Sequence, residues 1–100
     1  MKTKTLDPKV IQHAAKVFRA VSHPVRLALV EALEKKKRSV GELASALKQD
    51  QAVISKHLAV LKKAGVVTAE TDFNFRFYSL KNIHILDVLN CIRKSCGEGS

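Results

Sequence analysis

Apolar residues recur at spacings of three and four along most of this chain, which predicts a mostly α-helical fold. One segment departs from that spacing, because residues 66–80 are typical of two short strands around Asp72-Phe73-Asn74-Phe75. The pattern therefore indicates four helices, a small β-hairpin and a final helix. The predicted helices cover about residues 8–21, 24–37, 39–47, 51–64 and 82–96, and the predicted strands cover residues 66–71 and 76–80.

Residues that start and end helices support these boundaries. Asp7 is placed to cap the first helix, and Ser22-His23-Pro24 ends that helix and begins the second. Gly65 suits the end of the fourth helix, and Asn82 suits the start of the last one. The second helix carries apolar residues around so much of its circumference that we expect it to lie centrally.

Residues 39–65 have the form of a helix-turn-helix. Ser39 and Glu42 form a capping box for its first helix, and Asp50 is placed to cap its second. One face of the second helix is apolar, whereas the other presents amide, hydroxyl and ammonium groups suited to the major groove of DNA. The apolar face is Ile54, Leu58 and Leu61, and the polar face is Gln51, Ser55, Lys56, Ala59, Lys62 and Lys63.

Composition and charge narrow the class of partner. At 100 residues and 46% hydrophobic composition, we expect one domain over residues 1–100, with its core over about 8–96 and a frayed tail at 97–100. The net charge of +9 favours a polyanionic partner. No apolar run approaches the roughly 20 residues that span a bilayer, and the start lacks the apolar centre of a secretory signal. We therefore expect a cytoplasmic protein with two reduced cysteines.

Four sequence strings carry a family resemblance. They are FRAVSHPVRLALVEAL, SVGELASAL, QAVISKHLAVLKKAGVV and FRFYSL, and together they resemble the ArsR/SmtB family of bacterial repressors. The similarity covers about residues 10–90. It implies a winged helix-turn-helix fold and a homodimer, built mainly from the first and last helices, that represses transcription at an inverted-repeat operator. The two recognition helices of such a dimer would lie about 34 Å apart and enter successive major grooves of double-stranded DNA.

The match of motifs places Gln51, Ser55, Lys56 and His57 in the recognition helix. Ser55 and Lys56 fall on its exposed side together with Lys62, so we predict that they contact DNA. His57 neighbours the buried stripe. Two interpretations of this histidine therefore remain open, contact with DNA and packing against the preceding helix.

The predicted wing departs from the family pattern. Members often have glycine and several basic residues near the hairpin tip, whereas this chain has Asp72 there and Arg76 as the one nearby cation. Arg76 is therefore the candidate DNA contact of the wing, and whether the wing reaches DNA stays open. The aromatic residues Phe75, Phe77 and Tyr78 are expected to pack under the hairpin or at its base.

Family members differ chiefly in their inducer sites. A metalloid site on the helix before the turn would need cysteines, and residues 42–47 contain none. A zinc-type site on the last helix would use the positions of Asn82, His84, Ser95 and Glu98, of which only His84 and Glu98 could ligate. Because two ligands do not make a tetrahedral zinc site, we expect no zinc and interpret His84 as an interfacial or solvated histidine.

Both cysteines, Cys91 and Cys96, lie on the predicted last helix. In a regular helix their Cα atoms would be roughly 8.6 Å apart, beyond the limit of about 7 Å for a disulfide. An intrachain bridge would therefore need the last turn to open, and a partner chain could supply the second sulfur instead. Three interpretations remain open: the thiols are inert, they bind an inducer such as arsenite or antimonite, or they react with oxidants or reactive sulfur.

Sequence-specific repression is thus the leading hypothesis, and no cofactor is required for it. The charge motivates an alternative, a non-specific architectural DNA-binding protein, and a family member without an inducer is another. A thiol enzyme is disfavoured, because the spacing of Cys91 and Cys96 is not the Cys-x-x-Cys redox arrangement. We therefore expect no catalytic residues.

Overall fold

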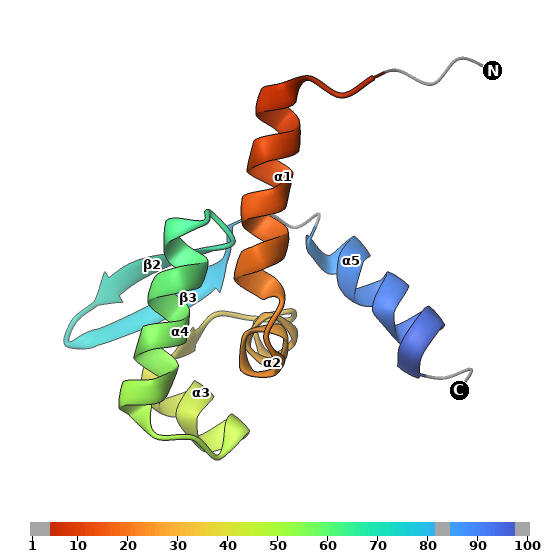
Figure 1. Cartoon of the computed structure of the whole chain (residues 1–100). Helices are drawn as coiled ribbons and strands as arrows, with labels where there is room; N and C mark the ends of the chain where they lie inside the picture. The colour runs from red at the N-terminus through yellow and green to blue at the C-terminus, as the bar shows by residue number, and fades with distance from the viewer. Residues whose placement is uncertain (1–4, 82–84, 98–100) are drawn as a thin grey trace.

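The computed structural model describes residues 5–81 and 85–97. In this part of the chain, four helices precede a β-hairpin and a fifth helix follows it, as the hydrophobic pattern predicts (Figure 1). The winged helix-turn-helix order is confirmed. The elements are α1 (Pro8–Val21), α2 (Pro24–Ala32), β1 (Arg38–Ser39), α3 (Val40–Leu47), α4 (Gln51–Lys63), β2 (Val67–Asp72), β3 (Phe75–Leu80), α5 (Ile85–Ile92) and the π-helical turn η1 (Arg93–Gly97).

Two helix ends follow the sequence signals closely. The Asp7 carboxylate accepts the backbone N–H of Lys9 at 2.8 Å and so caps α1. Gly65 follows α4 with φ of 81°, a left-handed conformation that glycine adopts without steric cost. The N–H groups of Gly65 and Val66 donate to carbonyls in the last turn of α4, at 3.0 and 2.9 Å. This Schellman motif ends the helix and directs the chain into β2.

The second helix is shorter than predicted. It ends at Ala32 and not near Lys37, because Arg38 and Ser39 leave the helix to form a third strand against β3. The guanidinium of Arg38 donates to the Ala32 carbonyl at 2.7 Å, which satisfies a carbonyl at the helix end. A two-residue strand has no visible alternation of polar and apolar residues, so the sequence did not predict β1.

The sheet has the strand order β1-β3-β2, with every pair antiparallel. Both strands reach one residue further toward the hairpin tip than predicted, because Asp72 pairs with Phe75 and leaves a two-residue turn, and β2 begins one residue later than predicted, at Val67. Tyr78 faces the core and is 7% exposed. Phe75, however, is 63% exposed, so the prediction that it packs under the hairpin is wrong. Phe75 lies three residues before Tyr78, and successive side chains of a strand point to opposite faces. Its side chain is therefore on the opposite face of β3 from Tyr78.

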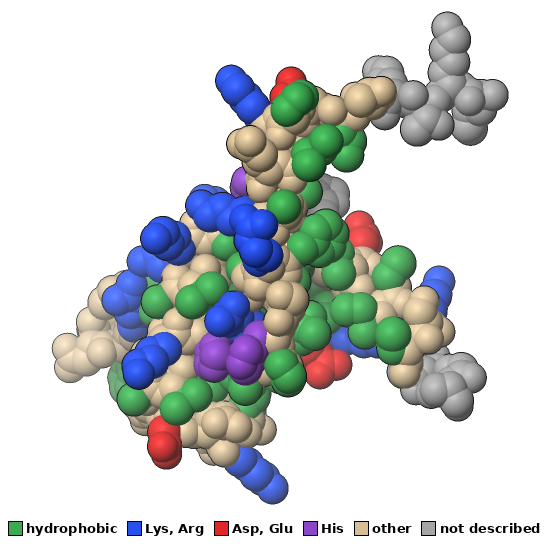
Figure 2. Space-filling model, viewed as in Figure 1, with side chains coloured by type: hydrophobic (Ala, Val, Ile, Leu, Met, Phe, Trp, Pro, Cys, Tyr) green, Lys and Arg blue, Asp and Glu red, His purple; other side chains and the backbone are tan. Residues whose placement is uncertain are grey.

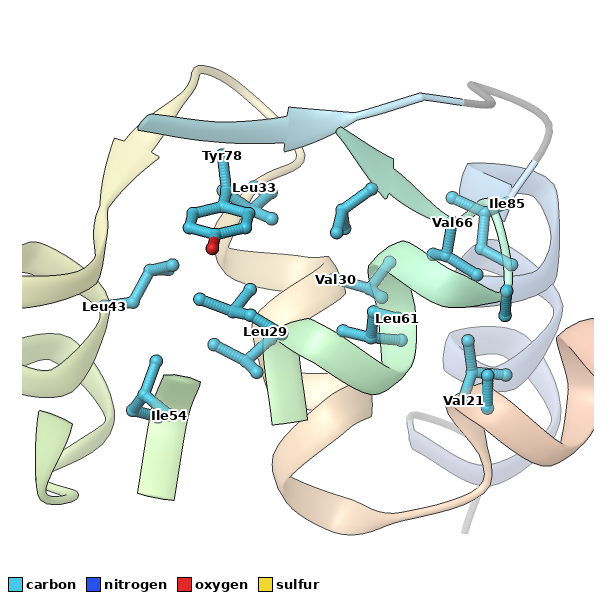
Figure 3. Packing of buried hydrophobic residues seen from close by; sticks show 14 of the residues in the cluster. Val21, Leu29, Val30, Leu33, Leu43, Ile54, Leu61, Val66, Tyr78 and Ile85 are labelled. Carbon is cyan, nitrogen blue, oxygen red and sulfur yellow. The ribbon is translucent and has the colours of Figure 1, made fainter. Parts of the chain in front are cut away.

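The core forms where α2, α3 and α4 meet the sheet. Leu29 and Val30 of α2 are fully buried, which confirms the central position predicted for this helix. Side chains from α3, α4 and β3 close around them (Figure 3). Burial of this apolar surface fixes the orientation of α4, and with it the direction of its polar face. The largest buried side chains are Leu29, Leu43, Ile54, Leu58, Leu61, Val30, Val66 and Val67.

The last helix is α-helical only in part. Ile85 and Leu89 of α5 are buried, but the helix changes to π-helical hydrogen bonding over η1, and Cys96 is exposed. The predicted start of this helix at Asn82 and the tail beyond Gly97 lie outside the described residues. None of the helices among the described residues is long and apolar enough to cross a membrane.

Candidate nucleic-acid interface

The helix-turn-helix is held by the local bonds that its sequence predicts. The Ser39 hydroxyl accepts the N–H of Glu42 at 3.1 Å, and the Glu42 carboxylate accepts the N–H of Ser39 at 2.9 Å. That second bond lowers the pKa of Glu42 below its usual value. Asp50 occupies the N-cap position of α4, but its side chain makes no capping hydrogen bond, so this predicted contact is wrong.

The exposed face of α4 is the candidate recognition surface. Ile54, Leu58 and Leu61 are fully buried, so the opposite side of the helix faces solvent along its whole length. That side carries amide, hydroxyl and ammonium groups and no carboxylate. The structure exposes every residue predicted for it: Gln51, Ser55, Lys56, Ala59, Lys62 and Lys63. Lys and Arg side chains gather over α4 and the adjoining part of α1 (Figure 2).

The wing contributes Arg76 to the same region. This exposed residue of β3 lines an open groove of about 630 Å³ together with Ser55, Ala59 and Lys62 of α4. Its guanidinium lies 5.6 Å from the centre of the Tyr78 ring, a cation–π contact that orients it along the sheet. The structure thus brings the predicted wing cation beside the predicted recognition helix.

His57 does not face solvent with the other predicted residues. Its ring packs against His23, with 4.5 Å between ring centroids, and its Nδ1 accepts the Nε–H of Arg26 at 3.1 Å. Arg26 also donates to the Ala20 carbonyl at 3.2 Å, and therefore links the end of α1 to α4. The geometry favours packing for His57, but against the start of α2 and not against the preceding helix α3, as the packing interpretation expected. The motif Ser-His-Pro-x-Arg contains His23 and Arg26. It gives no sign of their contact with His57, which lies 31 positions after Arg26 in the sequence.

Protonation of His57 should destabilise the fold. Burial, His23 and Arg26 lower the pKa of His57 below its ordinary value of 6.5. At pH values near 6.5 and below, the folded chain therefore binds fewer protons at this ring than the unfolded chain does. The neutral His57 ring contributes fully to folding stability above pH 6.5, and this contribution is lost as the pH falls below that value. We expect the free energy of unfolding, measured in urea between about pH 8 and pH 5.5, to decrease on acidification.

The His57→Gln variant is the matched control for this titration, because its amide oxygen can still accept from Arg26 but does not titrate. Its free energy of unfolding should fall less over the same interval. Glu34 and Glu42 also have lowered pKa values, and their contributions are lost only at lower pH, below the ordinary value of 4.5. Equal pH dependence in the wild type and the variant would contradict the assignment to His57.

The cysteines are both exposed and neither forms a disulfide. Cys91 lies on α5 and Cys96 on η1, so the distance expected from a regular α-helix does not apply between them. Within the described ranges, no group of three or more His, Cys, Asp and Glu side chains could hold a metal ion. His84 of the weak zinc-type site lies outside those ranges.

Ion pairs that join η1 to α2 and to the turn after it were not predicted. The guanidinium of Arg93 contacts Glu34 at 2.7 Å and Glu31 at 3.3 Å. The Arg93 hydrogen bond lowers the pKa of Glu34, and both glutamates raise the pKa of Arg93. The segment between the two cysteines is therefore tied to the helix that supports the helix-turn-helix. Because the partners are about 60 residues apart, sequence spacing gave no signal for this contact.

Comparison with known proteins places this architecture in a family. The family described as bacterial regulatory protein, arsR family, matches residues 23–69. The chain is 37% identical over 81 residues to the HTH-type transcriptional repressor SmtB of Mycobacterium tuberculosis, covering 81% of this chain and 60% of that protein. It therefore spans less than two thirds of SmtB. It is also 38% identical to the transcriptional regulator Rv0081 of the same organism, over 80% of this chain and 71% of that one.

A solved structure agrees with the sequence comparisons. The transcriptional repressor BigR from Xylella fastidiosa matches with a TM-score of 0.79 and 31% identity, over 86% of this chain and 88% of that chain. The chain belongs to the ArsR family of bacterial regulatory proteins, with a winged helix-turn-helix fold.

Proposed function

We propose that this protein is a homodimeric repressor that binds an inverted-repeat operator by placing α4 in the major groove. The observation that carries this proposal is the solvent-facing side of α4, where Gln51, Ser55 and Lys56 are exposed on a helix whose other side is anchored in the core. Amide and hydroxyl groups can read base edges, and lysines hold phosphates. Arg76 extends this contact toward the wing.

An apolar surface on α1 supports the proposed dimer. Val10, Ile11 and Phe18 are 50%, 50% and 54% exposed, on the side of α1 opposite its cations. The same side borders a hollow of about 230 Å³ between α1 and α5, lined in part by Ile85 and Val88. A second copy of the chain would remove this surface from water, which is the interface through the first and last helices implied by the family resemblance.

Selection of DNA ligands from a random pool tests the proposal. At physiological salt, the protein should enrich a palindromic sequence whose half-sites are centred about 10 bp apart, or a multiple of that distance. The enriched duplex should bind at least about 10³-fold more tightly than a scrambled one. Enrichment of sequences without two-fold symmetry would contradict the dimeric mode of binding.

Non-specific DNA binding is the second candidate, because the net charge of +9 alone favours any polyanion. It predicts nearly equal affinity for all duplexes and a steep loss of affinity with salt. The two candidates are separated by the ratio of affinities for the selected and scrambled duplexes, measured at one salt concentration.

We further propose that Cys91 and Cys96 form the inducer-responsive element. Both thiols are exposed. Cys91 lies on α5, the helix whose Ile85 and Val88 border the proposed dimer surface, and Cys96 lies on η1, which continues α5. Arg93 stands between them and holds this segment to Glu34 of the α2 end. Reaction of the thiols, or their binding of a metalloid such as arsenite, would change the packing of this segment and thus the spacing of the recognition helices.

Replacing each cysteine by serine separates the interpretations of these thiols. Wild-type protein on its selected operator should dissociate on addition of arsenite or of a persulfide donor, with an apparent affinity loss of about 5- to 150-fold. The Cys91→Ser and Cys96→Ser variants should bind the operator equally well and dissociate less. Fluorescence anisotropy measures both quantities. Equal dissociation of all three proteins would remove the thiols from the mechanism, and no dissociation of any of them would favour a family member without this inducer.

A further inference from the structure

A second set of cations lies beside α4, on the neighbouring helix α1. Lys16 and Arg19 are exposed, and they face the last turns of α4 across a groove of about 240 Å³. Lys63 closes the groove from the α4 side, and Arg26 is part of its lining. Val60 and Ala64 supply the apolar part. The groove therefore carries four cations, and none of its lining residues is acidic.

These cations are not neutralised within the described part of the chain. Arg26 is held by His57 and the Ala20 carbonyl, whereas no carboxylate there pairs with Lys16, Arg19 or Lys63. The ion pairs among the described residues lie elsewhere, between β2 and the turn after α2 and between α2 and η1. Positive charges gathered without counterions attract an anion from outside the chain.

The two sides of α1 are chemically distinct. At 100° per residue, Lys16 and Arg19 fall on the side opposite Val10 and Phe18. The apolar side is thus free to meet a second copy of the chain while the cationic side remains next to α4. In Figure 2 several blue side chains lie on the same face of the molecule over α1 and α4, with apolar side chains and other atoms between them.

The position of this groove relative to α4 suits a particular ligand. Ala59 lies near the middle of the exposed face of α4, with the groove of Arg76 on one flank and the groove of Lys16 on the other. An α-helix with its side chains is about 10–12 Å wide, and the major groove of B-DNA is about 12 Å wide. A helix seated there has a row of phosphates along each flank.

We propose that Lys16 and Arg19, together with Lys63, bind the sugar-phosphate backbone of duplex DNA along the edge of α4 that faces away from the wing. This inference rests on the proposed function and adds, through Lys16 and Arg19 of α1, a contact surface outside the helix-turn-helix. Arg76 binds phosphates on one side of the major groove, and Lys16 and Arg19 bind phosphates on the other side. Because phosphate contacts carry no base information, these residues set affinity and orientation and leave sequence preference unchanged.

The test compares two charge-matched variants of the full chain. Lys16→Gln/Arg19→Gln removes the proposed contacts. Lys35→Gln/Lys36→Gln removes the same amount of charge from two exposed positions in the turn that follows the C-terminal end of α2. Affinity for the selected operator and for a scrambled duplex is measured across a salt series. The first variant should lose about 10-fold or more in affinity for both duplexes, and its salt slope should fall by about 0.9 per contact, or about 4 for a dimer. Thermal unfolding verifies that both variants are folded.

The salt slopes of the two variants decide whether α1 contacts DNA. A clear loss of slope in Lys16→Gln/Arg19→Gln, with little change in Lys35→Gln/Lys36→Gln, supports the α1 surface. Equal losses in both variants would show that only total charge matters, and an unchanged slope would show that α1 does not touch DNA; either result overturns this inference. If the wild type itself does not prefer the operator to the scrambled duplex, the proposed function fails instead.

Discussion

Leu58→Ala should cost about 2–5 kcal/mol of folding stability. Leu58 is fully buried in α4, between the helix and the core formed by α2 and α3. Truncating it removes apolar contacts and leaves a cavity that a close-packed interior fills only in part. For a chain of this size each kcal/mol lowers the midpoint of thermal unfolding by about 4–8 °C, so we expect a decrease of at least about 8 °C.

Val60→Ala is the matched control for this prediction. Val60 lies two positions further along α4 and is 38% exposed, so its truncation removes much less buried surface. Circular dichroism during thermal and urea unfolding measures both variants, and the Val60→Ala midpoint should stay within a few degrees of the wild type. A Leu58→Ala midpoint equal to that of Val60→Ala would contradict the position of Leu58 in the core.

The second large effect is expected at the recognition surface. Gln51→Ala/Ser55→Ala should weaken binding to the selected operator by about 100-fold or more, because a good base contact is worth about 1–3 kcal/mol and a dimer loses each contact twice. Binding to a scrambled duplex should change little, since the phosphate contacts of Lys56 and Lys62 remain. The ratio of the two affinities therefore measures the loss of base recognition.

Gln49→Ala/Ser45→Ala makes the same chemical changes outside α4. Both side chains are exposed, Ser45 on α3 and Gln49 in the turn. This control should keep the operator preference and the thermal midpoint of the wild type. If the two double variants lost operator preference equally, α4 would not be the base-reading element.

The elements with strong periodic patterns could be predicted from sequence. The capping box of Ser39 and Glu42, the buried stripe around Leu58 and the exposed face of α4 all depend on local spacing, and the structure shows them as expected. Gly65 is a similar case, since a left-handed residue after a helix is a local requirement.

Features that depend on distant pairing could not be predicted in this way. The strand at Arg38 exists only because β3 offers it an edge, and its formation ends α2 early. The contact of Arg26 with His57 and that of Arg93 with Glu34 join helices whose packing no single-helix pattern specifies. Phe75 was predicted to be packed under the hairpin, but it is exposed, because hydrophobicity alone does not say which face of the hairpin is covered by the core.

Chemical footprinting of the selected operator tests the central claim most directly. Dimethyl sulfate methylates guanine N7, an atom that lies in the major groove. If α4 enters this groove, saturating protein should protect guanine N7 in two stretches about 10 bp apart, and the Gln51→Ala/Ser55→Ala variant should lose this protection at the same concentration. Full occupancy of the operator with every guanine N7 still reactive would contradict the account.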